Sequence, residues 1–181
     1  PTWVNAPADL TVECDGAGNT TDFSDWLDNT FTGTDNCPNW VITNDSTGLS
    51  DDCGETGTET VTFTLTDESG NFIELDATFT IVDTVDPFWD VAPSNLTVEC
   101  DGAGNTAEFD AWLNSTFSGS DTCSGLAVVT NNSTGLSDDC GETGTETVTF
   151  TLTDDCDNFI VLDATFTIVD TVDPFWDVAP S

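Results

Sequence analysis

Residues 59–83 read ETVTFTLTDESGNFIELDATFTIVD, and this stretch decides the fold. Thr alternates with Val, Phe and Leu through residues 59–67, which is the pattern of a strand with one buried and one solvated face. The polar turn at residues 67–71 separates this run from a second alternating run at 72–83, so the two runs predict a β-hairpin. Nearly the same sequence returns at residues 146–170.

The whole chain is a tandem repeat. The segment VECDGAGNT at residues 12–20 recurs at 98–106, and residues 76–94 recur unchanged as 163–181. Self-similarity at a fixed period marks an array of small structural units. We therefore expect one domain at residues 1–86, a second at 87–173 and the start of a third at 174–181, so that the chain is a piece of a longer array.

Shorter runs complete each repeat. Residues 10–13 and 40–43 are rich in β-formers and predict strands, and residues 126–130 are the counterpart of the second run. Between them, one face of a short helix is predicted by the spacing of Phe23, Trp26, Leu27 and Phe31, with Thr21 or Asp22 as its N-cap. Several short strands with turn signals predict an all-β fold: tandem immunoglobulin-like β-sandwich domains, each with one short helical insert.

The composition excludes several classes of function. The chain has 35 acidic residues and no Lys, Arg or His, which gives a net charge of −35. Such a field repels nucleic acid and anionic membrane surfaces, so we expect neither as a partner. Without His or Lys for general base catalysis, and without an activated cysteine or serine motif, we expect no enzymatic activity. The apolar residues are numerous and periodic, which predicts a folded chain.

Clustered carboxylates with no basic residue to neutralise them favour bound Ca²⁺, which takes oxygen ligands from flexible acidic loops. The candidate loops are residues 15–19, 34–36, 50–52, 67–71 and 83–86, with their copies in the second repeat. Turn residues chosen for backbone reasons are the alternative explanation of any single loop. We expect the junction to share an ion with a neighbouring loop, and the predicted ligands are Asp67, Asn71, Asp83, Asp86, Asp154, Asn158, Asp170 and Asp173.

Seven cysteines at repeating positions predict an oxidising, extracellular setting. Four cysteines in the second repeat allow three pairings. Because the loops TDNC and TDDC look alike, and because Ser69 stands where Cys156 does, we favour pairing the first cysteine with the third and the second with the fourth. The predicted bonds are Cys14–Cys53, Cys100–Cys140 and Cys123–Cys156. Cys37 is then left free, either as an unpaired thiol or bonded to another subunit.

The motifs APADLTVECDGAGNT, TDNC, GLSDDCG, TVTFTLTDDC and FTIVDTVDP together resemble the HYR-like immunoglobulin-fold repeats of very large surface adhesins of Bacteroidota, which include type IX-secreted, gliding-adhesin-like proteins. Where related repeats have Gly after the last cysteine, this chain has Asp157. The resemblance implies a location at the cell surface and O-glycans at the junction residues Thr84 and Thr171.

These observations lead to a structural interpretation. We expect a repeat of an extracellular filament or adhesin stalk that gives reach and stiffness, stabilised by calcium and disulfides, with neighbouring repeats or subunits of the same filament as partners. The alternative is a glycan- or surface-binding adhesive module that uses the junction aromatics Phe88 and Trp89. Trp89 has counterparts at Trp3 and Trp176, and this recurrence favours packing between domains.

Overall fold

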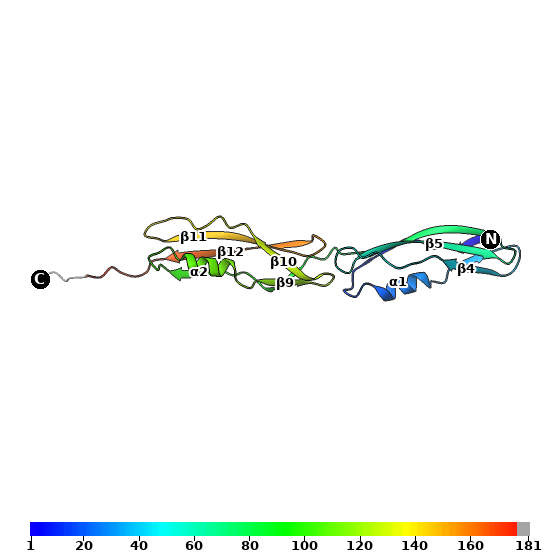
Figure 1. Cartoon of the computed structure of the whole chain (residues 1–181), viewed down its shortest axis with the longest axis horizontal. Helices are drawn as coiled ribbons and strands as arrows, with labels where there is room; N and C mark the ends of the chain where they lie inside the picture. Colours follow the sequence, from blue (N-terminus) through cyan, green and yellow to red (C-terminus); the bar gives the residue numbers. More distant parts are fainter. Residues whose placement is uncertain (177–181) are drawn as a thin grey trace. The chain divides into compact units, whose positions relative to one another are not determined.

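The computed structural model describes residues 1–176 and contains two compact units built from the same elements (Figure 1). Unit 1 comprises Pro1–Asp86 together with the short segments Asp121–Leu126 and Asp154–Asn158. Unit 2 comprises Pro87–Ser120, Ala127–Thr153 and the chain from Phe159 onward. The last part of the predicted third repeat, residues 177–181, lies outside the described residues.

The elements follow one another in the same order in both repeats. The first repeat contains β1 (Thr2–Asn5), β2 (Leu10–Glu13), α1 (Thr20–Leu27), β3 (Thr32–Thr34), β4 (Trp40–Asn44), β5 (Gly57–Asp67) and β6 (Phe72–Val82). The second contains β7 (Phe88–Val91), β8 (Leu96–Glu99), α2 (Thr106–Leu113), β9 (Ser118–Asp121), β10 (Gly125–Asn131), β11 (Gly144–Thr153) and β12 (Phe159–Val169). The predicted all-β fold with one short helix per repeat is confirmed.

The predicted hairpin is the centre of each sheet. β5 and β6 pair antiparallel from Gly57 opposite Ile81 to Thr66 opposite Phe72. β4 adds to β5 antiparallel and β2 adds to β6 in parallel, which gives the strand order β2-β6-β5-β4. In the second repeat, β8, β12, β11 and β10 follow the same order. There β9 also pairs with β10, so β7 and β9 extend the sheet beyond β10.

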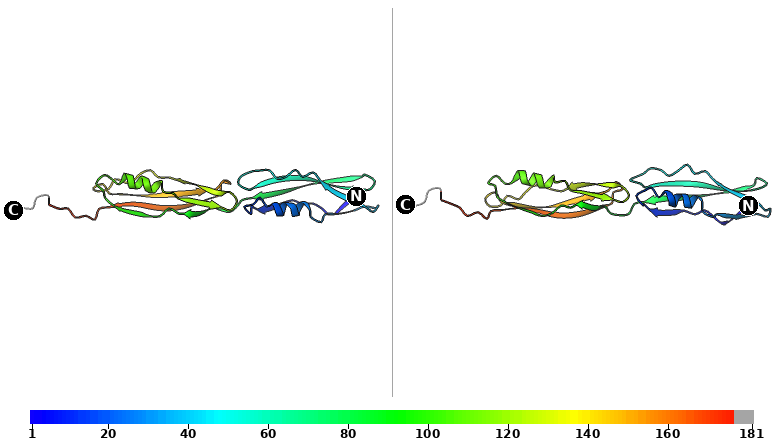
Figure 2. Two further views of the ribbon diagram at one scale, coloured as in Figure 1. Left: turned by 60° about the horizontal axis from the view of Figure 1, so that its bottom comes forward. Right: turned by 90° about the horizontal axis from the view of Figure 1, so that it is seen from below.

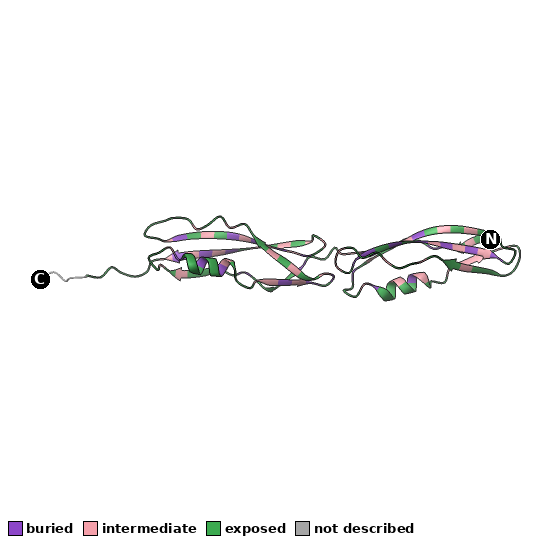
Figure 3. Cartoon of the chain, in the orientation of Figure 1, coloured by how far each residue is buried: buried purple, intermediate pink, exposed green. Residues whose placement is uncertain are grey.

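The buried face of the hairpin forms the core. Val61, Phe63 and Phe79 are each at most 1% exposed, whereas the threonines between them face solvent. This alternation is visible along β5 and β11 (Figure 3). Thr60 and Thr78 face each other across the solvated side with their hydroxyl oxygens 2.9 Å apart. The period-2 pattern therefore determines which residues form the core.

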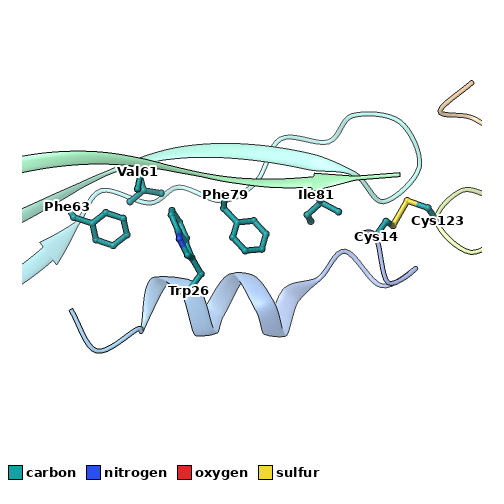
Figure 4. Packing of buried hydrophobic residues seen from close by; sticks show 8 residues of the cluster. Cys14, Trp26, Val61, Phe63, Phe79, Ile81 and Cys123 are labelled. Carbon is teal, nitrogen blue, oxygen red and sulfur yellow. A yellow bond between two sulfur atoms is a disulfide. The ribbon is translucent and has the colours of Figure 1, made fainter. Parts of the chain in front are cut away.

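The helix covers the core from the side opposite the hairpin (Figures 2 and 4). The Trp26 ring lies 5.4 Å from Phe63 and 5.5 Å from Phe79 between ring centroids, and its indole N–H donates to the Ala8 carbonyl at 2.9 Å. Trp26 is thus a core residue whose polar atom is satisfied. Trp112 takes the same place on α2 and donates to the Ser94 carbonyl at 2.9 Å.

The helix is shorter than the sequence pattern predicts. It ends at Leu27, yet Phe31 still packs on the core with its ring centroid 5.0 Å from that of Phe63. The N-cap is Asn19, not Thr21 or Asp22, and it has a left-handed backbone with φ of 46°. The Asn19 side chain accepts from the Asp15 N–H and donates to the Glu13 carbonyl, so the acidic turn before the helix is closed by its own hydrogen bonds.

Two short strand pairs were not expected from the sequence. β1 pairs antiparallel with β3, and β7 pairs antiparallel with β9. Alternation along β7 turns Trp89 onto the core of unit 2, while Phe88 is 54% exposed. Trp3 packs on the core of unit 1 in the same way. Trp89 therefore packs within its own unit, which replaces the interpretation that it packs between domains.

No helix within residues 1–176 has the length and apolar character needed to cross a membrane.

Candidate metal centre

Three aspartates converge at one place in unit 1. Asp83 directly follows β6, Asp121 is the last residue of β9, and Asp154 directly follows β11. One carboxylate oxygen from each lies within 4.8 Å of the other two. Because strand ends fix the backbone at all three positions, the carboxylates meet at a defined point.

Two of these carboxylates have an oxygen with no hydrogen-bond partner among the described residues. Asp121 is 6% exposed, and its Oδ1 accepts the N–H groups of Cys123 at 2.6 Å and Ser124 at 3.1 Å. Its Oδ2 is buried without a partner, as is Oδ2 of Asp83. An unpaired buried carboxylate oxygen is unfavourable unless a cation or a donor meets it.

The third carboxylate is held by its own loop. Asp154 Oδ1 accepts the N–H groups of Cys156 at 2.8 Å and Asn158 at 2.9 Å. The Asn158 side-chain amide donates to Asp154 Oδ2 at 3.0 Å and to the Asp83 carbonyl at 3.3 Å. Asn158 therefore positions the loop against the end of β6.

The negative charges of the cluster favour a bound cation. Burial raises the pKa of Asp83, and repulsion from Asp121 and Asp154 raises it further, against one hydrogen bond from the Val85 N–H. The sequence contains no Lys, Arg or His that could neutralise the three charges. Oxygens that share one Ca²⁺ lie about 2.3–2.6 Å from the ion and so up to about 5 Å apart, which the cluster satisfies.

Two disulfides attach the same loops to the rest of unit 1. Cys14 bonds Cys123 with Cα atoms 5.6 Å apart, and Cys53 bonds Cys156 with Cα atoms 5.2 Å apart. The Cys14–Cys123 bond extends the core cluster (Figure 4). Both bonds lie beside the aspartate cluster in sequence, two residues beyond Asp121 and Asp154.

The predicted pairing within each repeat is therefore wrong. Neither Cys14–Cys53 nor Cys100–Cys140 nor Cys123–Cys156 is formed, and the free cysteines of the described residues are Cys37, Cys100 and Cys140. Two cysteines can bond only when their Cα atoms lie within about 7 Å, whatever repeat they come from. The loops of residues 121–126 and 154–158 belong to unit 1, and this brings their cysteines to Cys14 and Cys53.

The predicted metal ligands separate into two groups. Asp83, Asp154 and Asn158 are brought together, although from different repeats. Asp67 and Asn71 cannot share an ion with Asp83, because they lie at opposite ends of β6. Its 11 residues span about 35 Å at about 3.3 Å per residue. Asp86, Asp170 and Asp173 are exposed and lie outside the cluster. Asp121 was not among the predicted ligands, although its loop is the copy of the candidate loop at residues 34–36.

The predicted glycosylation sites have hydrogen-bonded hydroxyls. Thr84 donates to Glu13 from its Oγ1 at 2.9 Å and from its N–H at 2.7 Å. Thr171 makes the equivalent pair of bonds to Glu99. Both threonines are exposed, and their modification stays a prediction.

Substitutions at two equivalent glycines test whether the loop at residues 121–126 packs against Gly16. Gly16 and Gly102 share a φ of +76°, but a Cβ on Gly16 would lie 2.4 Å from the Thr122 carbonyl oxygen, whereas one on Gly102 would meet nothing within 4 Å. We expect Gly16→Ala to lower the free energy of unfolding by about 1–3 kcal/mol more than Gly102→Ala, because only the first overpacks. Urea denaturation of both variants measures the difference, and equal losses would show that the loop does not contact Gly16.

No family model matches the chain, and comparison with curated proteins found no match. Solved structures that it resembles include PcdhgB3 EC1-4, at 15% identity and a TM-score of 0.32 over 64% of this chain and 32% of that one. Human CDH23 EC21-23 has 11% identity and a TM-score of 0.33 over 93% and 69%, and human Protocadherin-24 EC1-2 has 9% and 0.33 over 95% and 99%. The chain spans about a third to a half of the length of the first protocadherin structures that it matches. Similarity at this level establishes neither a relationship nor a function.

Proposed function

We propose that this chain is a structural module of an extracellular filament or adhesin stalk, fixed by disulfides and a bound Ca²⁺. One observation carries the proposal: the two loops of unit 1 that hold Asp121 and Asp154 are each attached by a disulfide, and their two carboxylates meet that of Asp83 at the end of β6. Residues of the second sequence repeat are thereby bound to the first by covalent bonds and a cation. The role requires no catalytic step, and its partners are neighbouring repeats or subunits of the same filament.

The chemistry of the chain supports an extracellular setting. Structural disulfides persist where the medium is oxidising. Extracellular fluids also supply Ca²⁺ at concentrations that weak acidic sites can use. A chain with a net charge of −35 and no basic residue depends on such cations for neutralisation.

A binding role is the second candidate. A surface hollow of about 230 Å³ in unit 1 is lined by Trp40 with Asn39 and Glu68, among other residues. Trp40 is 38% exposed, and an aromatic ring beside polar side chains suits the apolar face and hydroxyls of a sugar. Binding of wild-type protein on a glycan array, lost in Trp40→Ala, would support this function, and an array without signal would exclude it for the sugars tested.

Direct measurement of Ca²⁺ binding tests the proposed metal centre. Isothermal titration of the chelator-treated protein should give a saturable site that Asp121→Asn abolishes. Asp170→Asn is the matched control, because Asp170 is the copy of Asp83, removes the same charge and lies outside the cluster. Equal titrations for the two variants would show that Ca²⁺ only screens the surface.

A further inference from the structure

The two cysteines of unit 1 that hold neighbouring loops have copies in unit 2 that form no disulfide within the described residues. In unit 1, Cys14 and Cys53 hold the loops of residues 121–126 and 154–158. Their copies in the second repeat are Cys100 and Cys140, and both are free thiols. We call the surface formed by Cys100, Gly102, Cys140, Gly141 and Asp170 the socket.

The socket is open where the same surface of unit 1 is filled. A Cβ on Gly16 or Gly54 would lie 2.4 Å from the Thr122 carbonyl oxygen or 3.1 Å from the Cys123 carbonyl oxygen, respectively. At the same point on their copies, Gly102 and Gly141, no atom of residues 1–176 lies within 4 Å. Two adjoining hollows of about 500 Å³ each lie here, one lined by Cys100 and Gly102 and the other by Cys140, and Asp170 and Gly141 line both.

The first repeat carries a copy of the loops that fill such a surface. Residues 35–38 and 67–71 correspond to 121–124 and 154–158, and we call them the plug. Cys37 lies on the plug as Cys123 does on its loop, and Cys37 is exposed and free. Ser69 stands where Cys156 does, so the plug offers one thiol where the filled surface of unit 1 uses two.

Each turn of the plug shares with its copy a hydrogen bond to the leading aspartate, although Pro38 lacks the N–H that Ser124 donates to Asp121. The Cys37 N–H donates to Asp35 Oδ1 at 2.9 Å, as the Cys123 N–H donates to Asp121 Oδ1 at 2.6 Å. In the second loop, Asp67 accepts the Asn71 N–H at 2.9 Å, and Asp154 accepts the Asn158 N–H at 2.9 Å. No rearrangement of these turns is needed for docking, which lowers the entropic cost of association.

We propose that the plug of one copy of this chain docks on the socket of a second copy and that Cys37 bonds Cys100 of that copy. The occupant is a second copy because the chain itself carries a copy of the loop that fills unit 1: residues 35–38 keep the Asp and the Cys of residues 121–124, with Asn36 and Pro38 in place of Thr122 and Ser124. Such a contact is head-to-tail, so it builds linear chains of subunits. The inference deepens the proposed structural role by naming the partner and the bond.

The bond forms by oxidation of two thiols. Cys37 and Cys100 lose two protons and two electrons as their sulfur atoms join, and a low-molecular-weight disulfide such as oxidised glutathione takes these up and becomes two thiols. Calcium belongs in the reaction mixture, because the copies repel each other at a net charge of −35 each.

Oxidation of the purified chain with glutathione disulfide in calcium-containing buffer tests the proposal. Non-reducing electrophoresis should show a ladder of dimers and longer oligomers, and peptide mapping by mass spectrometry should identify the Cys37–Cys100 cross-link. Cys37→Ser and Cys100→Ser should each abolish the ladder. In Ser69→Cys, a second cross-link between position 69 and Cys140 should appear, as the Cys53–Cys156 bond predicts.

Three results would overturn the inference: an internal Cys100–Cys140 bond as the main product, cross-links spread evenly over the three thiols, or no ladder at all. Thermal unfolding of each variant shows that it is folded, so a missing ladder cannot be ascribed to loss of structure. Ca²⁺ titration of the same samples separates the two proposals, because binding that persists without a ladder would leave the metal centre intact and remove only the docking.

Discussion

Replacing both Cys14 and Cys123 by alanine is expected to lower the free energy of unfolding by about 3–5 kcal/mol, because a cross-link over a loop of this length removes much unfolded-state entropy. The bond closes a loop of 109 residues, so the unfolded chain gains conformational entropy when the bond is absent. Alanine avoids burying a hydroxyl beside the core, and changing both cysteines leaves no buried thiol. Guanidinium denaturation under non-reducing conditions measures the loss.

Cys37→Ala is the matched control for this prediction. Cys37 is the copy of Cys123 in the first repeat, but it is exposed and free, so its replacement should leave the denaturation midpoint unchanged. A wild type and a double variant with the same midpoint would contradict the assigned bond. Wild-type protein treated with a reductant should fall below the double variant, since it also loses the bond between Cys53 and Cys156.

Removing Ca²⁺ is expected to produce the second large effect. A ligand at one hundred times its dissociation constant that binds only the folded state adds about 2.7 kcal/mol to the free energy of unfolding. Wild-type protein should therefore lose about this much when a chelator replaces saturating Ca²⁺. Thermal and urea unfolding measure this loss. Adding Na⁺ to the chelated sample keeps the ionic strength constant, which separates binding at the site from general screening.

Asp121→Asn should change the free energy of unfolding in opposite directions with Ca²⁺ and with chelator. With Ca²⁺ present it removes a ligand and destabilises the protein. With chelator present it removes one of three mutually repelling carboxylates, one whose Oδ2 is buried without a partner, and should stabilise the protein. Asp170→Asn, which removes an exposed charge, should change the free energy of unfolding by the same amount in both conditions. A variant at Asp121 that behaves like the one at Asp170 would contradict the metal centre.

Local sequence pattern was sufficient for the sheet and the core. Alternation through residues 59–83 identifies Val61, Phe63 and Phe79 as buried, and they are, because the side-chain period of a strand does not depend on distant residues. The spacing of Phe23 and Trp26 likewise indicates the helix face. The short strands β1 and β3 were missed because three or four residues carry too little periodicity to identify a strand.

The candidate site could be predicted only in part. Acidic junctions and turns pointed to Asp83 and Asp154, since carboxylates without basic neighbours favour cations. Asp121 was missed because nothing in a local window marks it as different from Asp35, its copy. The same ambiguity misled the cysteine pairing, because Cys14 has equivalent candidate partners in both repeats.

The sequence by itself determined the central hairpins, their core faces, the place of the helix and the strongly acidic character of this chain, because each depends on neighbours a few residues apart. Only the tertiary structure decided which copy of each loop belongs to unit 1, and hence that Asp83 meets Asp121 and Asp154, whereas Asp170 meets no such partners within residues 1–176. Near-identical repeats give near-identical local signals, so residues of equal sequence differ only through contacts made about a hundred positions away.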